Sequence, residues 1–140
     1  MAYSPTKYAI RGISEIRDPI PMNDKRMLMT HIETLQSPKC DAALEAALEN
    51  IGLIAVQMSA RFVLLFNVLP AIEPLLTSDN PRIVAKAAYA IECIAKSGGA
   101  DDIVASGCLA VLRSHITDPD QRMATRRACA AAIGFIYANV

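Results

Sequence analysis

The sequence has no tryptophan, few other aromatic residues and no excess of charge of either sign. Aromatic residues make up 5% of the 140 residues, whereas hydrophobic residues of all kinds make up 53%. The apolar content therefore falls mainly on small and aliphatic side chains, which suit closely packed helices. Fourteen basic residues balance fourteen acidic ones, so net charge gives no reason to expect a nucleic acid or an anionic membrane as the partner.

The chain also lacks a hydrophobic run long enough to cross a membrane. Its most apolar stretch, residues 51–76, is interrupted by Gln57, Arg61, Pro70 and Glu73. It therefore falls short of the ~20 apolar residues that a spanning helix needs. The first residues, MAYSPTKYAIRG, show no secretory signal. We expect no membrane segment.

No CxxC pair occurs among the cysteines, which are Cys40, Cys93, Cys108 and Cys129. All four fall within helix-like patterns. A chain of this length buries enough surface to fold without disulfides. We therefore expect reduced thiols in an intracellular protein.

Signatures of catalysis and of metal binding are missing as well. The sequence has no phosphate loop, HExxH motif or nucleophile elbow. Cys108 and His115 are seven residues apart (115−108), which is about 10 Å along a helix and too far for a nucleophile and its base. His31 and His115 have no Cys or His partner at metal-ligand spacing and are interpreted as polar edge residues. We predict no enzyme activity, no metal and no cofactor.

What the sequence does contain is a helical pattern that recurs. In residues 81–98, PRIVAKAAYAIECIAKSG, the apolar residues fall at helical spacing. Ile91 in this helix has counterparts at Ile51 and Ile133, at offsets of 40 (91−51) and 42 (133−91). A period of this size indicates stacked helical repeats. It predicts that the three isoleucines are buried at equivalent positions.

Each predicted unit has a short helix, a middle helix, a turn and a long helix. The middle helices are predicted at residues 25–35, 68–76 and 108–116, and the long helices at residues 39–57, 81–98 and 122–139. A capping residue and a proline precede each long helix, as Ser37–Pro38, Asn80–Pro81 and Asp118–Pro119. Asn67 and Gly107 follow the short helices. We predict that they match as helix exits, because both residue types tolerate the left-handed backbone of a sharp exit. A further helix over residues 4–17 is predicted to cap the first unit.

The segment SGGADDIVASGCLAVLRSHITDPD, preceded by AAYAIECIA, resembles the armadillo repeat, in which a short helix ends at Gly and leads into two longer ones. The resemblance runs from residue 23 to the C-terminus and is clearest over residues 68–138. It implies an all-α fold, a right-handed α-solenoid (armadillo-like superhelix) of about three repeats, preceded by an N-terminal helix and linker in residues 1–22. The repeats are residues 23–58, 59–98 and 99–140. The two-helix HEAT repeat is the alternative. Tetratricopeptide repeats are disfavoured, because their period is 34 residues.

The resemblance implies a non-enzymatic protein-interaction module that acts as an adaptor, scaffold or assembly subunit. In armadillo proteins the long helices line a concave groove, where peptide-binding members carry a Trp and an Asn one turn apart. Tyr89 and Cys93 take these two positions here, so the ladder that clamps basic peptides is largely missing. The groove residues that the resemblance implies are Glu45, Glu49, Leu53, Tyr89, Cys93, Arg127 and Phe135.

Charge is predicted to polarise this groove. Asp41, Glu45 and Glu49 form an acidic stripe at one end, and Arg122, Arg126 and Arg127 lie at the other. Such a groove would orient a partner of complementary polarity, while the alternative interpretation is a solvated helix face. The basic cluster has no interleaved aromatic residues for base stacking, which disfavours nucleic-acid binding.

The end of the sequence predicts a second interface. A terminal repeat needs a polar outer side, but residues 130–137 form an almost unbroken apolar run. We therefore predict that another chain covers this edge, with Ile133, Ile136 and Tyr137, either as a second copy in a homodimer or as a different protein.

Two other functions remain open at this point. One is a permanent structural subunit of a large complex, such as a ciliary or cytoskeletal one. The other is a HEAT-like enzyme acting on nucleic acid, which the zero net charge disfavours. The resemblance implies a cytoplasmic protein, with the nucleus and the cilium as alternatives.

Overall fold

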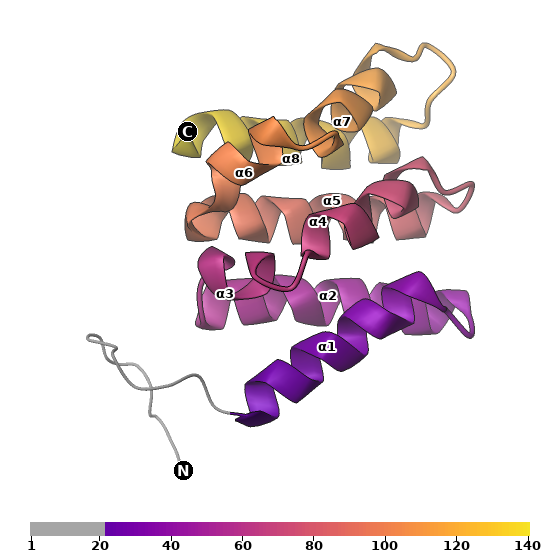
Figure 1. Cartoon of the computed structure of the whole chain (residues 1–140). Helices are drawn as coiled ribbons and strands as arrows, with labels where there is room; N and C mark the ends of the chain where they lie inside the picture. Colours follow the sequence, from indigo (N-terminus) through magenta and orange to yellow (C-terminus); the bar gives the residue numbers. More distant parts are fainter. Residues whose placement is uncertain (1–21) are drawn as a thin grey trace.

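The computed structural model describes residues 22–140, and every regular element in this range is a helix (Figure 1). The predicted all-α class is therefore confirmed for these residues, while the helix predicted over residues 4–17 lies outside the described range. In chain order the elements are α1 (Met22–Gln36), α2 (Asp41–Gln57), α3 (Ala60–Leu64), α4 (Val68–Ile72), η1 (Glu73–Thr77), α5 (Pro81–Ile94), η2 (Ala95–Gly99), α6 (Ala100–Ala105), α7 (Cys108–Thr117) and α8 (Met123–Asn139).

The helices form two layers. The three long helices α2, α5 and α8 lie side by side in one layer, and α1, α4 and α7 lie against the same side of it (Figure 1). Within the long-helix layer α5 contacts both α2 and α8. Across the layers α1 packs on α2, η1 on α5 and α7 on α8. The middle element of the second unit is divided into α4 and η1, because Pro74 has no N–H to donate to an α-helical hydrogen bond.

The hydrophobic core lies between the two layers. Ile51 and Ile91 are fully buried in it, as predicted. Ile133 is only half-buried, whereas Ile136 on the same helix, α8, is fully buried. Ile133 lies beside the buried face of α8, which consists of Thr125, Cys129, Ala132 and Ile136. This stripe follows the spacing i, i+4, i+7, i+11 of one helix face.

Only one of the three predicted capping junctions is correct. Asn80 is the N-cap of α5, and its side chain accepts a hydrogen bond from the Arg82 backbone N–H at 2.9 Å with Pro81 at the first helical position. Helix α2 instead begins after Cys40, and α8 begins after Arg122. The Asp118 side chain accepts from the Asp120 N–H at 2.9 Å and so closes a turn before the helix.

The predicted match between Asn67 and Gly107 is also only half correct. Asn67 has the left-handed backbone, with φ 57°. Gly107 has an ordinary φ of −77°. A Cβ there would lie 2.8 Å from a carboxylate oxygen of Glu73, the end of a flexible side chain that could move aside.

Candidate functional site

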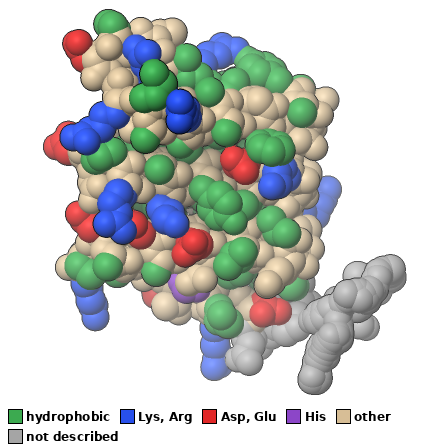
Figure 2. Space-filling view, turned by 180° about the vertical axis from the view of Figure 1, so that it is seen from behind, with side chains coloured by type: hydrophobic (Ala, Val, Ile, Leu, Met, Phe, Trp, Pro, Cys, Tyr) green, Lys and Arg blue, Asp and Glu red, His purple; other side chains and the backbone are tan. Residues whose placement is uncertain are grey.

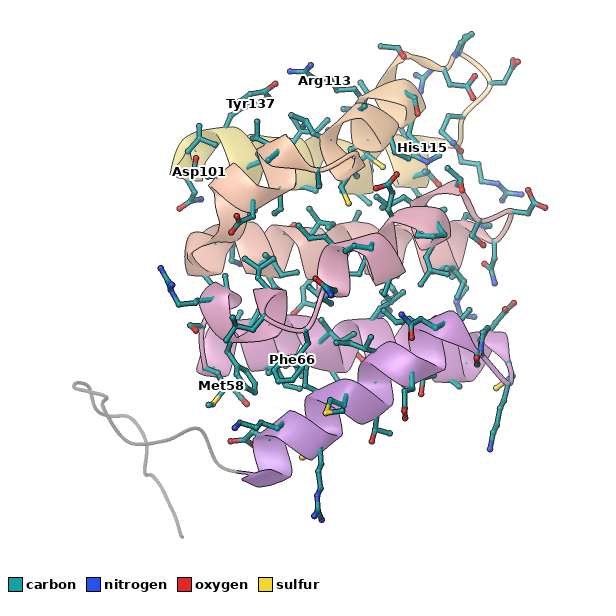
Figure 3. The ribbon with its side chains drawn as sticks, in the orientation of Figure 1. Met58, Phe66, Asp101, Arg113, His115 and Tyr137 are labelled. Carbon is teal, nitrogen blue, oxygen red and sulfur yellow. The ribbon has the colours of Figure 1, made fainter. Side chains whose placement is uncertain are left out.

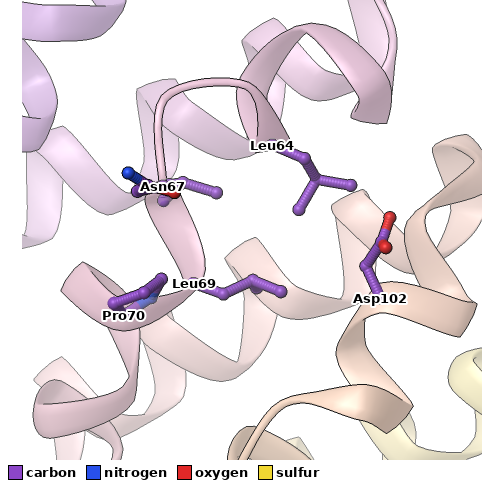
Figure 4. Close-up of a pocket in the computed structure, with 6 residues that line it drawn as sticks. Leu64, Asn67, Leu69, Pro70 and Asp102 are labelled. Atoms are coloured by element: carbon purple, nitrogen blue, oxygen red, sulfur yellow. The ribbon is translucent and has the colours of Figure 1, made fainter.

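Residues 22–140 contain no metal-ligand cluster, and the pocket at α3, α4 and α6 has a single ionisable lining residue. No three His, Cys, Asp or Glu side chains in this range are placed to hold a metal ion. A shallow pocket of about 210 Å³ lies at α3, α4 and α6, lined by Leu64, Asn67, Val68, Leu69, Pro70 and Asp102 (Figure 4). Among these lining residues Asp102 is the one ionisable group. The pocket therefore lacks the pair of groups that acid–base or nucleophilic chemistry requires.

The outward face of the long-helix layer is the more informative surface (Figure 2). It carries charged side chains mainly over one half and hydrophobic ones over its middle and other half. Leu53 on α2 is 42% exposed and Phe135 on α8 is 37% exposed. Tyr89 on α5 is half-buried. Three predicted groove residues, one from each long helix, are thus accessible to a partner.

Cys93 is not accessible, and its predicted place in the groove surface is wrong. It is 1% exposed because it fills the contact between α5 and α2. A Cβ on Gly52 would lie 3.1 Å from the Cys93 sulfur and 3.3 Å from the Tyr89 ring. Burial raises the pKa of the Cys93 thiol, and hydrogen bonding with Cys93 raises the pKa of the Tyr89 hydroxyl. Both groups are therefore neutral at pH 7, and Cys93 belongs to the packing between the helices, while Tyr89 is half-buried beside it.

The acidic stripe on α2 is engaged by α5. Glu45 pairs with Arg82 at 3.2 Å, and Glu49 pairs with Lys86 at 3.3 Å. One turn before Glu45 on α2, the Asp41 carboxylate accepts a hydrogen bond from the Asn80 side-chain amide at 2.9 Å. Two of the three carboxylates at the predicted acidic end of the groove are therefore paired with basic side chains of the same chain. The sequence contains the signal, since two acidic residues four apart on α2, Glu45 and Glu49, face two basic residues four apart on α5, Arg82 and Lys86.

The basic end is different. Arg126 donates two hydrogen bonds to the Asp118 carbonyl, at 2.6 and 3.2 Å. Arg127 is exposed, and among the described residues it has no carboxylate within ion-pair distance. Its guanidinium is thus available to a partner.

The predicted C-terminal edge keeps one of its three residues at the surface. Ile136 is fully buried, so its predicted role at an outward edge is wrong, and Ile133 is half-buried. Tyr137 is 47% exposed, and the Arg113 guanidinium lies 5.6 Å from its ring centroid (Figure 3). Phe135 is covered in part by Lys96, whose ammonium lies 4.8 Å from the ring centroid. Both contacts fall within cation–π range.

His115 joins two units of the fold, whereas His31 lies half-buried on α1. His115 is half-buried and bridges two units, with Nε2 at the Leu76 carbonyl and Nδ1 accepting from the Gln121 amide at 2.7 Å (Figure 3). Burial lowers the pKa of His31 on α1. The sequence placed both at polar edges, and it could not indicate the long-range contact to Leu76.

Comparison with protein-family models and with curated protein sequences gave no match. Within residues 22–140, no helix combines the length and the apolar character needed to cross a membrane.

Proposed function

We propose that the chain is a non-enzymatic protein-interaction module built as an armadillo-like, right-handed α-solenoid. The side-by-side arrangement of α2, α5 and α8 supports the solenoid, because each long helix belongs to one predicted repeat. The proposed role is that of a cytoplasmic adaptor, scaffold or assembly subunit that needs no cofactor.

The observation that carries this proposal is the apolar surface across the long helices. Leu53 and Phe135 expose 42% and 37% of their surface. Tyr89, on the helix between them, is half-buried. Water-exposed aromatic and aliphatic side chains on adjacent helices are typical anchors for a protein partner. The ion pairs Glu45–Arg82 and Glu49–Lys86 would form the polar rim of such a site.

The test is affinity capture from cells, with quantitative mass spectrometry, using three forms of the chain. Leu53→Ser with Phe135→Ser should lose the specific partners of the wild type. Val104→Ser is the matched control, because Val104 on α6 is 44% exposed but lies outside the long-helix layer. Partners retained by the double variant, or lost equally from the control, would contradict the proposed surface.

A permanent structural subunit is the second candidate. It is favoured by the large apolar side chains near the C-terminus, since Met123 and Tyr137 are 60% and 47% exposed. A subunit of this kind should aggregate when it is produced without its complex, whereas a reversible adaptor should stay monodisperse in size-exclusion chromatography.

A further inference from the structure

The middle helices of the three units share one register. Leu28 and Ile32 are buried on α1. The residues 40 positions later (68−28) and 80 positions later (108−28) are buried as well, namely Val68, Ile72, Cys108 and Leu112. Each pair is four residues apart and so lies on one face of its helix. This offset therefore aligns the buried faces of α1, α4 and α7.

Met29 departs from this register. Its counterparts are Leu69 (69−29) and Leu109 (109−29), which are 7% and 8% exposed, whereas Met29 is 50% exposed. Leu109 is covered although no later unit follows it in the described chain. The cover that Met29 lacks therefore comes from an element that the second and third units have and the described part of the first unit does not.

The short helix is that element. Helix α3 precedes α4, and α6 precedes α7. Leu64 of α3 lines the same pocket as Leu69 of α4 (Figure 4). Helix α1 begins at Met22, so no short helix precedes it in residues 22–140. It also continues without a break through Met27, the counterpart of Asn67, where the second unit turns.

We propose that residues 8–16 of this chain, through Ile13 and Ile16, cover Met29 in the place that α3 and α6 take in the other units. Each short helix buries two apolar side chains three residues apart, namely Ala60 and Val63 on α3, and Ala100 and Ile103 on α6. Ile13 and Ile16 repeat this spacing. The proposal rests on the equivalence of the units in the proposed fold and not on its partner surface.

The chain is long enough to place these residues there. Met29 lies seven residues after Met22 (29−22), which is about 10 Å along a helix. Residues 17–21 connect Ile16 to α1, and five extended residues span up to about 17 Å. The connection also favours this segment over a second copy of the chain, because a short tether gives an effective concentration in the millimolar range.

Oxidation by hydrogen peroxide tests the contact, with Met27 as the internal control. Met27 and Met29 are 53% and 50% exposed, and residues two apart on a helix lie on opposite flanks. Tandem mass spectrometry of the full chain should show Met29 oxidised at least fivefold more slowly than Met27. Ile16→Asp should raise the rate at Met29 to that of Met27 and leave Met27 unchanged. Ser4→Asp adds the same charge outside the apolar pattern and should keep Met29 protected.

Equal oxidation rates at Met27 and Met29 in the wild type would overturn the proposal. So would an Ile16→Asp variant that leaves Met29 protected, or one that accelerates both methionines alike. Protection of Met29 that is lost on dilution from about 100 to 1 µM would also overturn it, because a second copy would then supply the cover. Leu53→Ser with Phe135→Ser should not change the oxidation pattern, so this contact and the surface of the proposed function can fail separately.

Discussion

Gly52 and Gly134 both lie inside long helices, but Gly52 is buried and Gly134 is exposed. A Cβ on Gly52 would come within 3.1 Å of the Cys93 sulfur and 3.3 Å of the Tyr89 ring. A Cβ on Gly134 would meet nothing within 4 Å. The same substitution should therefore have opposite effects at the two sites.

We expect Gly134→Ala to stabilise the chain by about 0.5–1 kcal/mol, because alanine is the better helix former and no neighbour must move. Gly52→Ala should destabilise it, because overpacking a tight contact costs about 1–3 kcal/mol and outweighs the same gain in propensity. Urea unfolding of the two variants beside the wild type measures both. A loss of stability in Gly134→Ala would show that its face is already covered in the free chain.

At the residue scale, helical periodicity predicted burial well but did not predict which helix would cover a given face. Ile51 and Ile91 were placed correctly in the core. Cys93 and Ile136 were predicted at surfaces and are buried, because the rotation of a helix about its axis depends on its neighbours. A pattern on one helix contains no information on that rotation beyond the width of its apolar stripe.

At the scale of elements, three similar junctions in the sequence give three different structures. Asn80 caps α5 by accepting from the Arg82 N–H and also donates to Asp41 on α2. Ser37 precedes a proline in the same way, but α2 begins at Asp41, after Cys40 as its N-cap. The order of helices was predictable from periodicity. The exact caps were not, because a Ser, Asp or Asn before proline also fits a turn.

This difference predicts unequal effects of removing the two side chains. Asn80→Ala should lower the free energy of unfolding by about 0.5–2 kcal/mol, the usual cost of losing an N-cap. Ser37→Ala is the matched control and should change it by less than about 0.5 kcal/mol, as exposed substitutions generally do. Chemical denaturation of both variants is the measurement. Equal losses would mean that Ser37 also caps a helix in solution.

At the scale of the whole molecule, the long helices differ in how much of each is covered. Helix α5 lies between α2 and α8 and contacts both, whereas α8 contacts α5 but has no long helix beyond it in residues 22–140. Arrays in which each unit contacts only its neighbours gain stability from each interface, so that end units open more easily than central ones.

Native-state hydrogen exchange should therefore show the slowest amides in α5 and faster exchange in α8, with the difference largest in the second half of α8. Equal exchange rates in α5 and α8 would instead mean that the chain opens as one cooperative unit.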